Sequence, residues 1–163
     1  MLAPSHEPML HSEKFTDARS KFSLLFDEAV QDQLPVVIEH GGREHGLLMA
    51  RDALLRVLAP FRMHVDVLPE DDGGFTLWLR ELDVGGSGAS LKEARDQLVS
   101  AACSYARDYW QQFGLYRRLP DMSAKEPYVL RLSLAETQPE LLDVLFGGDS
   151  APDPSPKPLA YAA

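Results

Sequence analysis

Residues 15–33 read FTDARSKFSLLFDEAVQDQ, and residues 35–50 read PVVIEHGGREHGLLMA. The first stretch spaces its apolar side chains along one helical face, which predicts a single amphipathic helix. Those side chains are Ala18, Phe22, Leu25, Phe26, Ala29 and Val30. In the second stretch, two apolar runs flank Gly41-Gly42, which predicts a hairpin because glycines adopt the positive φ of a tight turn. About forty residues are too few to bury a full core, so we expect this unit to require a partner subunit.

The order of these elements resembles the N-terminal module of the Phd/YefM (prevent-host-death) antitoxin family. In that family a short strand leads into a helix that begins with Ala-Arg. A Pro-initiated strand, a Gly-containing turn, an apolar strand and a short acidic-capped helix follow. The matching residues are Phe15, Thr16, Ala18-Arg19, Phe22, Leu25–Phe26, Pro35–Ile38, Gly41–Arg43, Gly46–Ala50 and Asp52–Leu54. Glu44-His45 depart from the family, which usually has a small residue and Pro or Val there. The resemblance implies a dimerising, DNA-binding α/β module over residues 14–59, after a flexible N-terminus over residues 1–13.

Four residues of this module are candidates for DNA contact. Thr16 is expected to cap the first helix, which leaves Arg19 in the first turn, where a cation is unfavourable for the helix dipole. The resemblance implies that this end of the dimer faces the operator, where Arg19 and Lys21 meet phosphates or base edges. Arg43 at the hairpin tip is the fourth candidate. For each cation the alternative is a solvated side chain without a partner molecule.

The dimer interface is expected on the apolar face of the same module. Two copies would pair their helices and sheets, which presents two copies of Arg19 at symmetric half-sites. The candidate interface residues are Phe22, Leu25, Phe26 and Leu48.

The charge balance limits the possible partners. The 163 residues include 16 Lys and Arg against 25 Asp and Glu, a net charge of −9, and no long segment is basic. This argues against non-specific adhesion to nucleic acid, so DNA binding would require a few cations clustered on one face of a dimer. An acidic protein also suits a basic partner, such as an RNA-cleaving toxin.

Other features indicate a cytoplasmic protein without a metal or cofactor. No stretch approaches the roughly 20 apolar residues that cross a bilayer, and the N-terminus lacks the pattern of a signal peptide. The single Cys103 cannot form an internal disulfide, which fits a reducing compartment. It is expected to be a packing residue rather than a catalytic thiol. His40 and His45 flank the hairpin turn without a third ligand, so they make a weak metal site.

A second module begins after Pro60, where the periodicity changes from helical to alternating. The stretch FRMHVDVLPEDDGGFTLWLREL (residues 61–82) predicts two strands joined by a polar turn. A short Gly-rich third strand follows in residues 82–90, and Ser90-Leu-Lys-Glu93 has the form of a capping box. Beyond it, an apolar stripe predicts a helix of about five turns. The stripe contains Leu91, Ala94, Leu98, Ala102, Tyr105 and Tyr109.

This β-β-β-α order over residues 61–116 resembles the partial RNase-H-like core of HicB antitoxins. The residues that carry the resemblance are Glu70–Phe75, Leu82, Gly85, Gly88, Ser90–Ala94, Leu98 and Ala102. Arg80-Glu81 stand where the family commonly has Pro. Nuclease activity requires several carboxylates around divalent metal, and Asp66 is the only acidic residue within the first strand. We therefore expect no enzyme here, and the resemblance implies a non-catalytic domain that contacts a toxin. Trp78 and Trp110 are expected to pack or to face an interface.

Residues 117–148 mix short apolar patches with prolines. The alternating residues 128–134 suggest a strand, and residues 139–146 suggest a short helix that ends at Gly147-Gly148. Two alternatives are equally open: the segment folds on a toxin, or it packs back on the second module. The candidate toxin-binding residues are Leu141, Leu142, Leu145 and Phe146. Residues 149–163 hold four prolines and are expected to be disordered.

These observations predict an α+β protein that acts as the antitoxin of a type II toxin–antitoxin system. It would form a homodimer, bind and block a cognate toxin, and repress its own operon by binding operator DNA. One alternative is an orphan DNA-binding regulator without a toxin. Another is an interaction protein that does not bind DNA.

Overall fold

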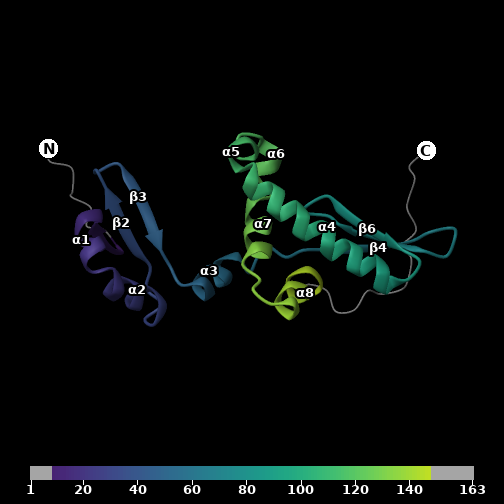
Figure 1. Cartoon of the computed structure of the whole chain (residues 1–163), viewed down its shortest axis with the longest axis horizontal. Helices are drawn as coiled ribbons and strands as arrows, with labels where there is room; N and C mark the ends of the chain where they lie inside the picture. Colours follow the sequence, from purple (N-terminus) through teal and green to yellow (C-terminus); the bar gives the residue numbers. More distant parts are fainter. Residues whose placement is uncertain (1–8, 148–163) are drawn as a thin grey trace. The chain divides into compact units, whose positions relative to one another are not determined.

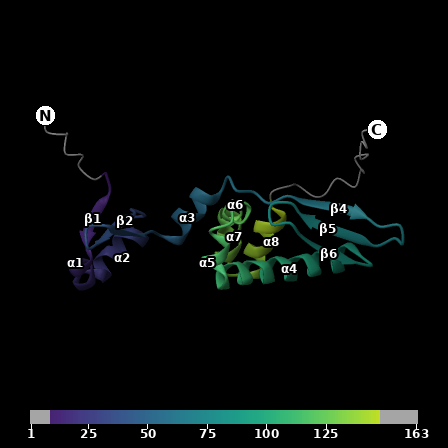
Figure 2. The same ribbon diagram turned by 90° about the horizontal axis from the view of Figure 1, so that it is seen from above.

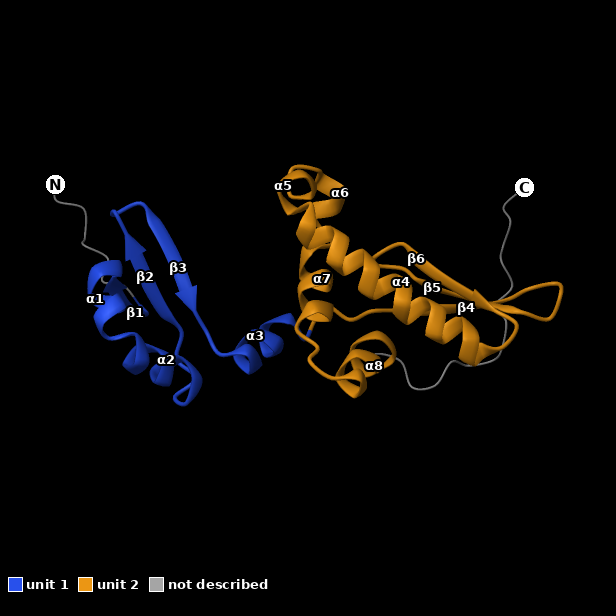
Figure 3. Ribbon diagram, viewed as in Figure 1, with its two compact units in different colours: residues 1–59 blue, residues 60–163 orange. Residues whose placement is uncertain are grey.

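The computed structural model describes residues 9–147 and contains helices and two small sheets, so the fold is α+β (Figure 1). The chain divides into two compact units, residues 1–59 and 60–163 (Figure 3). The tail over residues 149–163 and most of the expected flexible N-terminus lie outside the described residues.

The first unit is a three-stranded sheet with short helices. Its strands are β1 (His11–Lys14), β2 (Val36–His40) and β3 (Glu44–Leu48), and its helices are α1 (Phe15–Ser20), α2 (Phe22–Val30) and α3 (Arg51–Leu58). β2 is the central strand, parallel to β1 and antiparallel to β3. The end of the segment expected to be flexible, residues 11–13, therefore belongs to a strand. Ser12 also donates a hydrogen bond of 2.6 Å from its hydroxyl to Glu39 on β2.

The expected single helix over residues 15–33 is wrong, because the structure breaks it at Lys21. The backbone of Lys21 leaves the helical region at φ −112° and ψ 13°. The Ser20 hydroxyl also bonds back to the Asp17 carbonyl, which is a local competitor to helix continuation. This break lets Ala18 of α1 and Leu25 of α2 pack into one cluster with Val36 of β2.

The expected cap at Thr16 is also wrong. α1 begins at Phe15, its N-cap position is Lys14, and no side chain caps it. Thr16 is instead an exposed residue of the first helical turn. The hairpin prediction is confirmed, because Gly41 and Gly42 adopt φ values of 60° and 71° between β2 and β3.

The core of the first unit is small. Its buried cluster contains Ala18, Leu25 and Val36, with Ile38 and Leu48 packed partly buried against it. The predicted helical stripe is therefore divided: Ala18, Leu25 and Ala29 are buried, whereas its other members remain exposed. The exposed members are Phe22, Phe26 and Val30.

The second unit packs helices against an antiparallel sheet of order β4-β5-β6. The strands are β4 (Val65–Pro69), β5 (Phe75–Leu79) and β6 (Val84–Gly88). The helices are α4 (Leu91–Gln111), α5 (Phe113–Tyr116), α6 (Pro120–Ser123), α7 (Glu126–Ser133) and α8 (Gln138–Phe146). The three predicted strands and the long helix are confirmed. α4 runs alongside the sheet in both views (Figures 1 and 2).

Local chemistry explains where α4 begins and how closely it approaches the sheet. The Ser90 hydroxyl accepts a hydrogen bond from the Glu93 N–H, and the Glu93 carboxylate accepts one from the Ala89 N–H, so the predicted capping box is present. A Cβ at Gly86 would lie 2.7 Å from the Leu98 Cα, and one at Gly88 would lie 2.7 Å from the Ala94 nitrogen. β6 therefore contacts the backbone of α4 directly.

The core of the second unit joins the sheet, α4 and the C-terminal helices. Its buried residues are Met63, Leu77, Leu79, Leu82, Ala94, Leu98, Ala102, Ala106, Tyr109, Val129, Leu132 and Leu145. The Tyr109 hydroxyl donates a hydrogen bond of 3.1 Å to the Met122 carbonyl, which connects α4 with α6. Lys125 and Arg131 donate hydrogen bonds to the carbonyls of Leu82 and Phe61.

The strand expected over residues 128–134 is wrong, because this segment lies in α7. Val129 and Leu132 are three residues apart, so a helix places both on the buried face, whereas a strand would place them on opposite faces. Pro127 lies in the first helical turn, where its missing N–H leaves no bond unmade. The helix expected over residues 139–146 is confirmed as α8, and the Thr137 hydroxyl caps it by accepting from the Glu140 N–H.

Candidate functional site

The predicted DNA-contacting side chains lie at two places in the first unit. Thr16, Arg19 and Lys21 lie on or directly after α1, and Arg43 lies at the β2–β3 turn. All four are exposed. Within residues 9–147, Arg19 and Arg43 form no ion pair, so both guanidinium groups can bind an anion.

Lys21 differs from these two arginines because it has a partner. Its ammonium group lies 3.2 Å from Glu13 of β1, and this hydrogen bond lowers the pKa of the Glu13 carboxyl. A phosphate would have to compete with Glu13 for Lys21. Lys21 is therefore a weaker DNA-binding candidate than Arg19.

A second ion pair connects β1 with α2. His11 Nδ1 lies 2.9 Å from the Glu28 carboxylate, and this hydrogen bond raises the pKa of His11. The carboxylates of Glu28 and Glu13 both stabilise the protonated imidazole. The pair fixes the short edge strand β1 to the helix that carries the exposed phenylalanines.

The apolar face of α2 is the largest departure from ordinary burial in the first unit. The side chains of Phe22 and Phe26 are 51% and 46% exposed, with ring centroids 6.1 Å apart. Together with Ser23 and Asp27 they line a hollow of about 320 Å³. We refer to Phe22, Phe26 and Val30, which are spaced four residues apart on α2, as the α2 apolar face; all three are exposed large hydrophobic residues.

Two other predicted interface residues belong to the core instead. Leu25 is buried, and Leu48 packs partly buried against the same cluster. In this fold both stabilise the first unit from within. The predicted interface therefore reduces to Phe22 and Phe26 among the four candidates.

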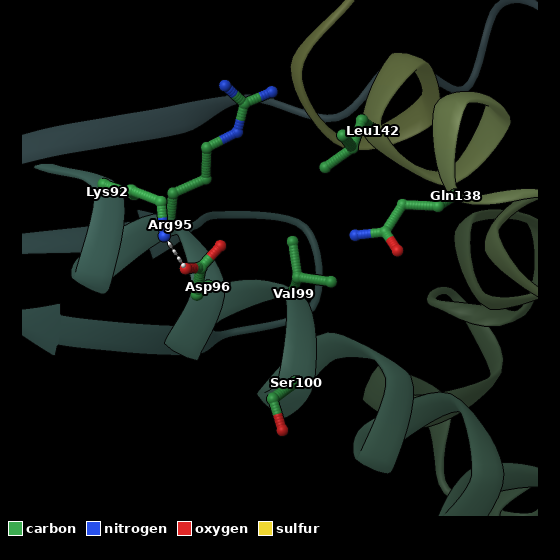
Figure 4. A pocket seen from close by; sticks show the side chains of 7 residues that line it. All are labelled: Lys92, Arg95, Asp96, Val99, Ser100, Gln138 and Leu142. Carbon is green, nitrogen blue, oxygen red and sulfur yellow. Dashed lines mark hydrogen bonds and ion pairs between the residues drawn. The ribbon is translucent and has the colours of Figure 1, made fainter.

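The four predicted toxin-binding residues lie on α8, which packs back on the second unit. Leu145 is buried in the core, whereas Leu141 and Phe146 pack partly buried against it. Leu142 is half-buried and lines a groove of about 510 Å³ between α8 and α4. In Figure 4, Gln138 and Leu142 of α8 face Val99 of α4 across this groove.

The groove carries charge as well as apolar surface. Lys92 pairs with Asp96 at 3.1 Å, one helical turn further along α4. The Arg95 guanidinium lies 4.3 Å from the centroid of the Phe146 ring, in cation–π contact. Of the four candidates, Leu142 is the one whose side chain lines the groove.

The described residues contain no cluster of three or more His, Cys, Asp or Glu side chains that could hold a metal ion. His40 instead hydrogen-bonds to Glu44 at 3.0 Å, and Asp66 accepts a hydrogen bond of 2.6 Å from Arg80. This bond with Arg80 lowers the pKa of Asp66. Asp66 therefore serves as a surface ion-pair partner on β4.

The comparisons with known proteins agree with one another. Residues 9–146 match the PHD_like family, described as "Antitoxin of toxin-antitoxin, RelE / RelB, TA system". The chain belongs to this antitoxin family. A crystal structure from Syntrophomonas wolfei subsp. wolfei, described as an antitoxin part of a proposed toxin/antitoxin system, has the same fold with a TM-score of 0.73. The two sequences are 24% identical, and the similarity covers 84% of this chain and 97% of the other. None of the curated proteins compared with the chain matches it.

Family membership confirms the central sequence prediction at a coarse level. The protein is an antitoxin of a toxin–antitoxin system, which implies a cognate toxin as its partner. It also points to a non-enzymatic regulatory protein. No helix within residues 9–147 of the antitoxin is long and apolar enough to cross a membrane.

Two features of the antitoxin's surfaces were missed from the sequence. Leu24 lies outside the predicted helical stripe, on another side of α2 from Phe22 and Phe26, yet it is an exposed large hydrophobic residue. A leucine off the stripe was the signal that could have found it. Arg95 lies on the polar side of α4, and its contact with Phe146 depends on α8 folding back, which no local pattern predicts.

Proposed function

We propose that this protein is the antitoxin of a type II toxin–antitoxin system that binds and blocks a cytoplasmic toxin and represses its own operon. In this proposal the first unit is a Phd/YefM-like module that dimerises and binds operator DNA. The second unit is a HicB-like domain that contacts the toxin. Membership of the antitoxin family supports the general role.

The main observation that supports dimerisation is the α2 apolar face. A unit with a three-residue buried cluster leaves three large hydrophobic side chains on one face of a helix in solvent. Exposed apolar patches of this kind mark interaction sites, because their burial removes apolar area from water. A second copy offers the same face, and a two-fold interface is self-complementary. Phe22 and Phe26 would then pack against their symmetry mates.

A dimer would also help this acidic protein to bind DNA, because it brings together more exposed cations. With a net charge of −9, a monomer has little general attraction for a duplex. Arg19 and Arg43 are exposed and form no ion pair within residues 9–147, and a dimer carries two copies of each. The four guanidinium groups can then act together on the DNA. Thr16, three residues before Arg19 on α1, supplies a hydroxyl for a phosphate oxygen.

Toxin binding is assigned to the second unit. The acidic charge of the chain favours association with a basic toxin surface. Of the predicted toxin-binding residues, Leu142 lines the groove between α4 and α8, where its apolar side chain is accessible. Leu145 contributes by holding α8 in place, because its side chain is buried in the core.

Sedimentation of the full-length protein tests the dimer. The wild type is expected to sediment as a dimer at micromolar concentration, and Phe26→Asp as a monomer. Leu115→Asp is a matched control, because Leu115 is 56% exposed on α5 of the second unit. A wild type that is monomeric at this concentration would contradict the proposal.

Mobility shift on the DNA upstream of its own gene tests the repressor role. Arg19→Ala should weaken binding and reduce the slope of log K against log salt by about 1 for each phosphate that the protein no longer neutralises. Arg107→Ala, an exposed change on α4, should leave the slope unchanged. Absence of any retardation at low salt would leave an antitoxin that does not bind DNA.

Co-expression with the product of the adjacent reading frame tests neutralisation. Rescue of growth and co-purification are expected. Retardation of the promoter DNA without any toxin partner would instead favour the orphan regulator.

A further inference from the structure

The sheet of the second unit has one face that packs on the core and one that does not. Residues alternate between the faces of a strand, and Leu77 and Leu79 of β5 belong to the core. Their neighbours Thr76 and Trp78 therefore face the other way, and so does Leu68 of β4. Leu68 is 47% exposed and Trp78 is 37% exposed. We call the surface formed by Asp66, Leu68, Thr76, Trp78, Gly85 and Ser87 the outer sheet face.

The Trp78 indole packs against a glycine on the neighbouring strand. Trp78 pairs with Gly85 in the register of β5 and β6. A Cβ at Gly85 would lie 2.7 Å from Cε3 and 3.0 Å from Cζ3 of the indole, so the ring occupies the space of the missing side chain. With 37% of Trp78 exposed, the rest of the indole is accessible from solvent, where a cation can lie against the aromatic ring.

The surroundings of this ring are acidic. The hairpin Val65–Leu79 contains four carboxylates and no Lys or Arg. Asp66, the cross-strand neighbour of Trp78, is paired with Arg80. At the other end, Glu70 accepts a hydrogen bond from the Thr76 hydroxyl, which also contacts the Ser87 hydroxyl at 2.6 Å. Asp71 and Asp72 extend the negative charge along the exposed turn.

We propose that the outer sheet face docks a basic surface of the cognate toxin, with an Arg or Lys side chain of the toxin lying on the Trp78 indole. This rests on the proposed function and identifies a toxin-contacting surface on the second unit. Leu68 supplies apolar contact beside the ring, and the turn at residues 70–72 supplies the opposite charge that orients the partner. Tryptophan in a partly apolar, charged setting is also the residue most enriched among binding hot spots.

Charge excludes the other occupants of this face. A second copy in two-fold contact through it would bring two acidic hairpins together, and like charges at an interface are repulsive. A nucleic acid backbone would meet Glu70, Asp71 and Asp72 of this hairpin, whereas Arg80, the cation beside it, is already paired with Asp66. A basic protein surface satisfies both the charge and the aromatic ring.

Titration of the co-purified product of the adjacent reading frame against full-length variants tests the assignment. Trp78→Ala should raise the dissociation constant about tenfold or more, as for a hot-spot residue. Trp110→Ala is the matched control, because Trp110 is 36% exposed and lies on α4; its binding should stay within about threefold of wild type. Thermal melts check that both variants are folded. Glu70→Gln with Asp71→Asn should weaken binding and reduce its dependence on salt.

A variant that displaces the Trp78 ring without removing it gives a further test, because it changes the position of the ring rather than the amount of contact surface. Gly85→Ala keeps Trp78 but displaces its ring, so it should weaken binding and shift the Trp78 fluorescence measured in a Trp110→Phe background. Trp78→Phe should retain part of the affinity, because it keeps an aromatic face.

The possible outcomes separate the inference from the proposed function. Equal affinity of wild type and Trp78→Ala, or an equal loss in the Trp110→Ala control, would overturn the outer sheet face as the contact while the antitoxin function stands. A change of oligomeric state in Trp78→Ala alone would assign the face to a second copy and also overturn it. Absence of any complex with the wild type would overturn the proposed neutralisation and the inference together.

Discussion

The contact between β6 and α4 makes a sharp prediction for Gly86→Ala. The added methyl would lie 2.7 Å from both the Gln97 carbonyl carbon and the Leu98 Cα, and closer still to the Leu98 nitrogen. Ordinary contact begins at 3.4 Å, so either α4 or β6 must retreat by at least about 0.7 Å, and by more than that to clear the Leu98 nitrogen. The atoms in the way belong to the helix backbone, which cannot rotate aside as a side chain does.

The cost follows from the core that this contact closes. A gap of about 0.5–1 Å forfeits a quarter to a half of the dispersion energy of each atom pair, and a buried leucine makes about 40–60 such contacts. Leu98 is such a residue and faces the sheet. Together with the usual range for overpacking, this gives a loss of about 3 kcal/mol in the free energy of unfolding. For a unit of this size, the melting temperature should fall by about 12–24 °C.

Urea and thermal denaturation followed by circular dichroism measure this loss. Gly114→Ala is the matched control, because a Cβ at Gly114 meets nothing within 4 Å. It lies in α5, where alanine should be neutral or stabilising by up to about 1 kcal/mol. If Gly86→Ala changes the free energy of unfolding by less than about 0.5 kcal/mol, the close packing of α4 on β6 is incorrect.

Three further predictions concern other elements. The hydrogen bond with Glu28 raises the pKa of His11. The pair therefore stabilises the first unit fully at pH values below 6.5, the ordinary pKa of histidine, and this stabilisation is lost as the pH rises through the raised pKa. The melting temperature of the first unit should therefore fall as the pH rises from about 6.5 through the raised pKa of His11, and less so in His11→Gln. Leu145→Ala should cost about 2–5 kcal/mol in urea unfolding and Leu142→Ala about 1 kcal/mol or less; equal small effects would mean that α8 is not packed in the free protein. Ser90→Ala should cost about 0.5–2 kcal/mol because it removes the α4 cap, and an unchanged urea midpoint would refute that role.

The accuracy of prediction from the sequence depended on whether the deciding signal was local. The Gly41-Gly42 turn and the Ser90 capping box are determined by neighbouring residues, and both are confirmed. The break at Lys21 is different, because it lets two short helices pack on one sheet, and a helical stripe contains no information about that sheet. The strand predicted over residues 128–134 was wrong for the same reason. Apolar and polar residues alternate in this segment, but the face that α7 buries is set by a core assembled from distant elements.

The same difference between local and long-range signals applies to the candidate site residues. Exposed cations such as Arg19 could be selected from the sequence because charged side chains remain at the surface. The distinction between Leu25 in the core and Phe26 in solvent could not, because both lie on the predicted apolar stripe. That distinction depends on which part of the stripe faces the three-stranded sheet. Ala18 and Leu25 pack against the sheet, whereas both phenylalanines and Val30 stay exposed.

The glycines of β6 show how one strand serves both the core and the surface. Gly86 and Gly88 face α4, and their missing side chains bring the helix backbone onto the sheet. Gly85 faces the opposite way, and its missing side chain leaves room for the Trp78 indole. Because strand residues alternate in direction, the two effects are separable by mutation. A methyl at Gly86 should therefore destabilise the second unit, whereas a methyl at Gly85 should mainly alter the surface that we assign to the toxin.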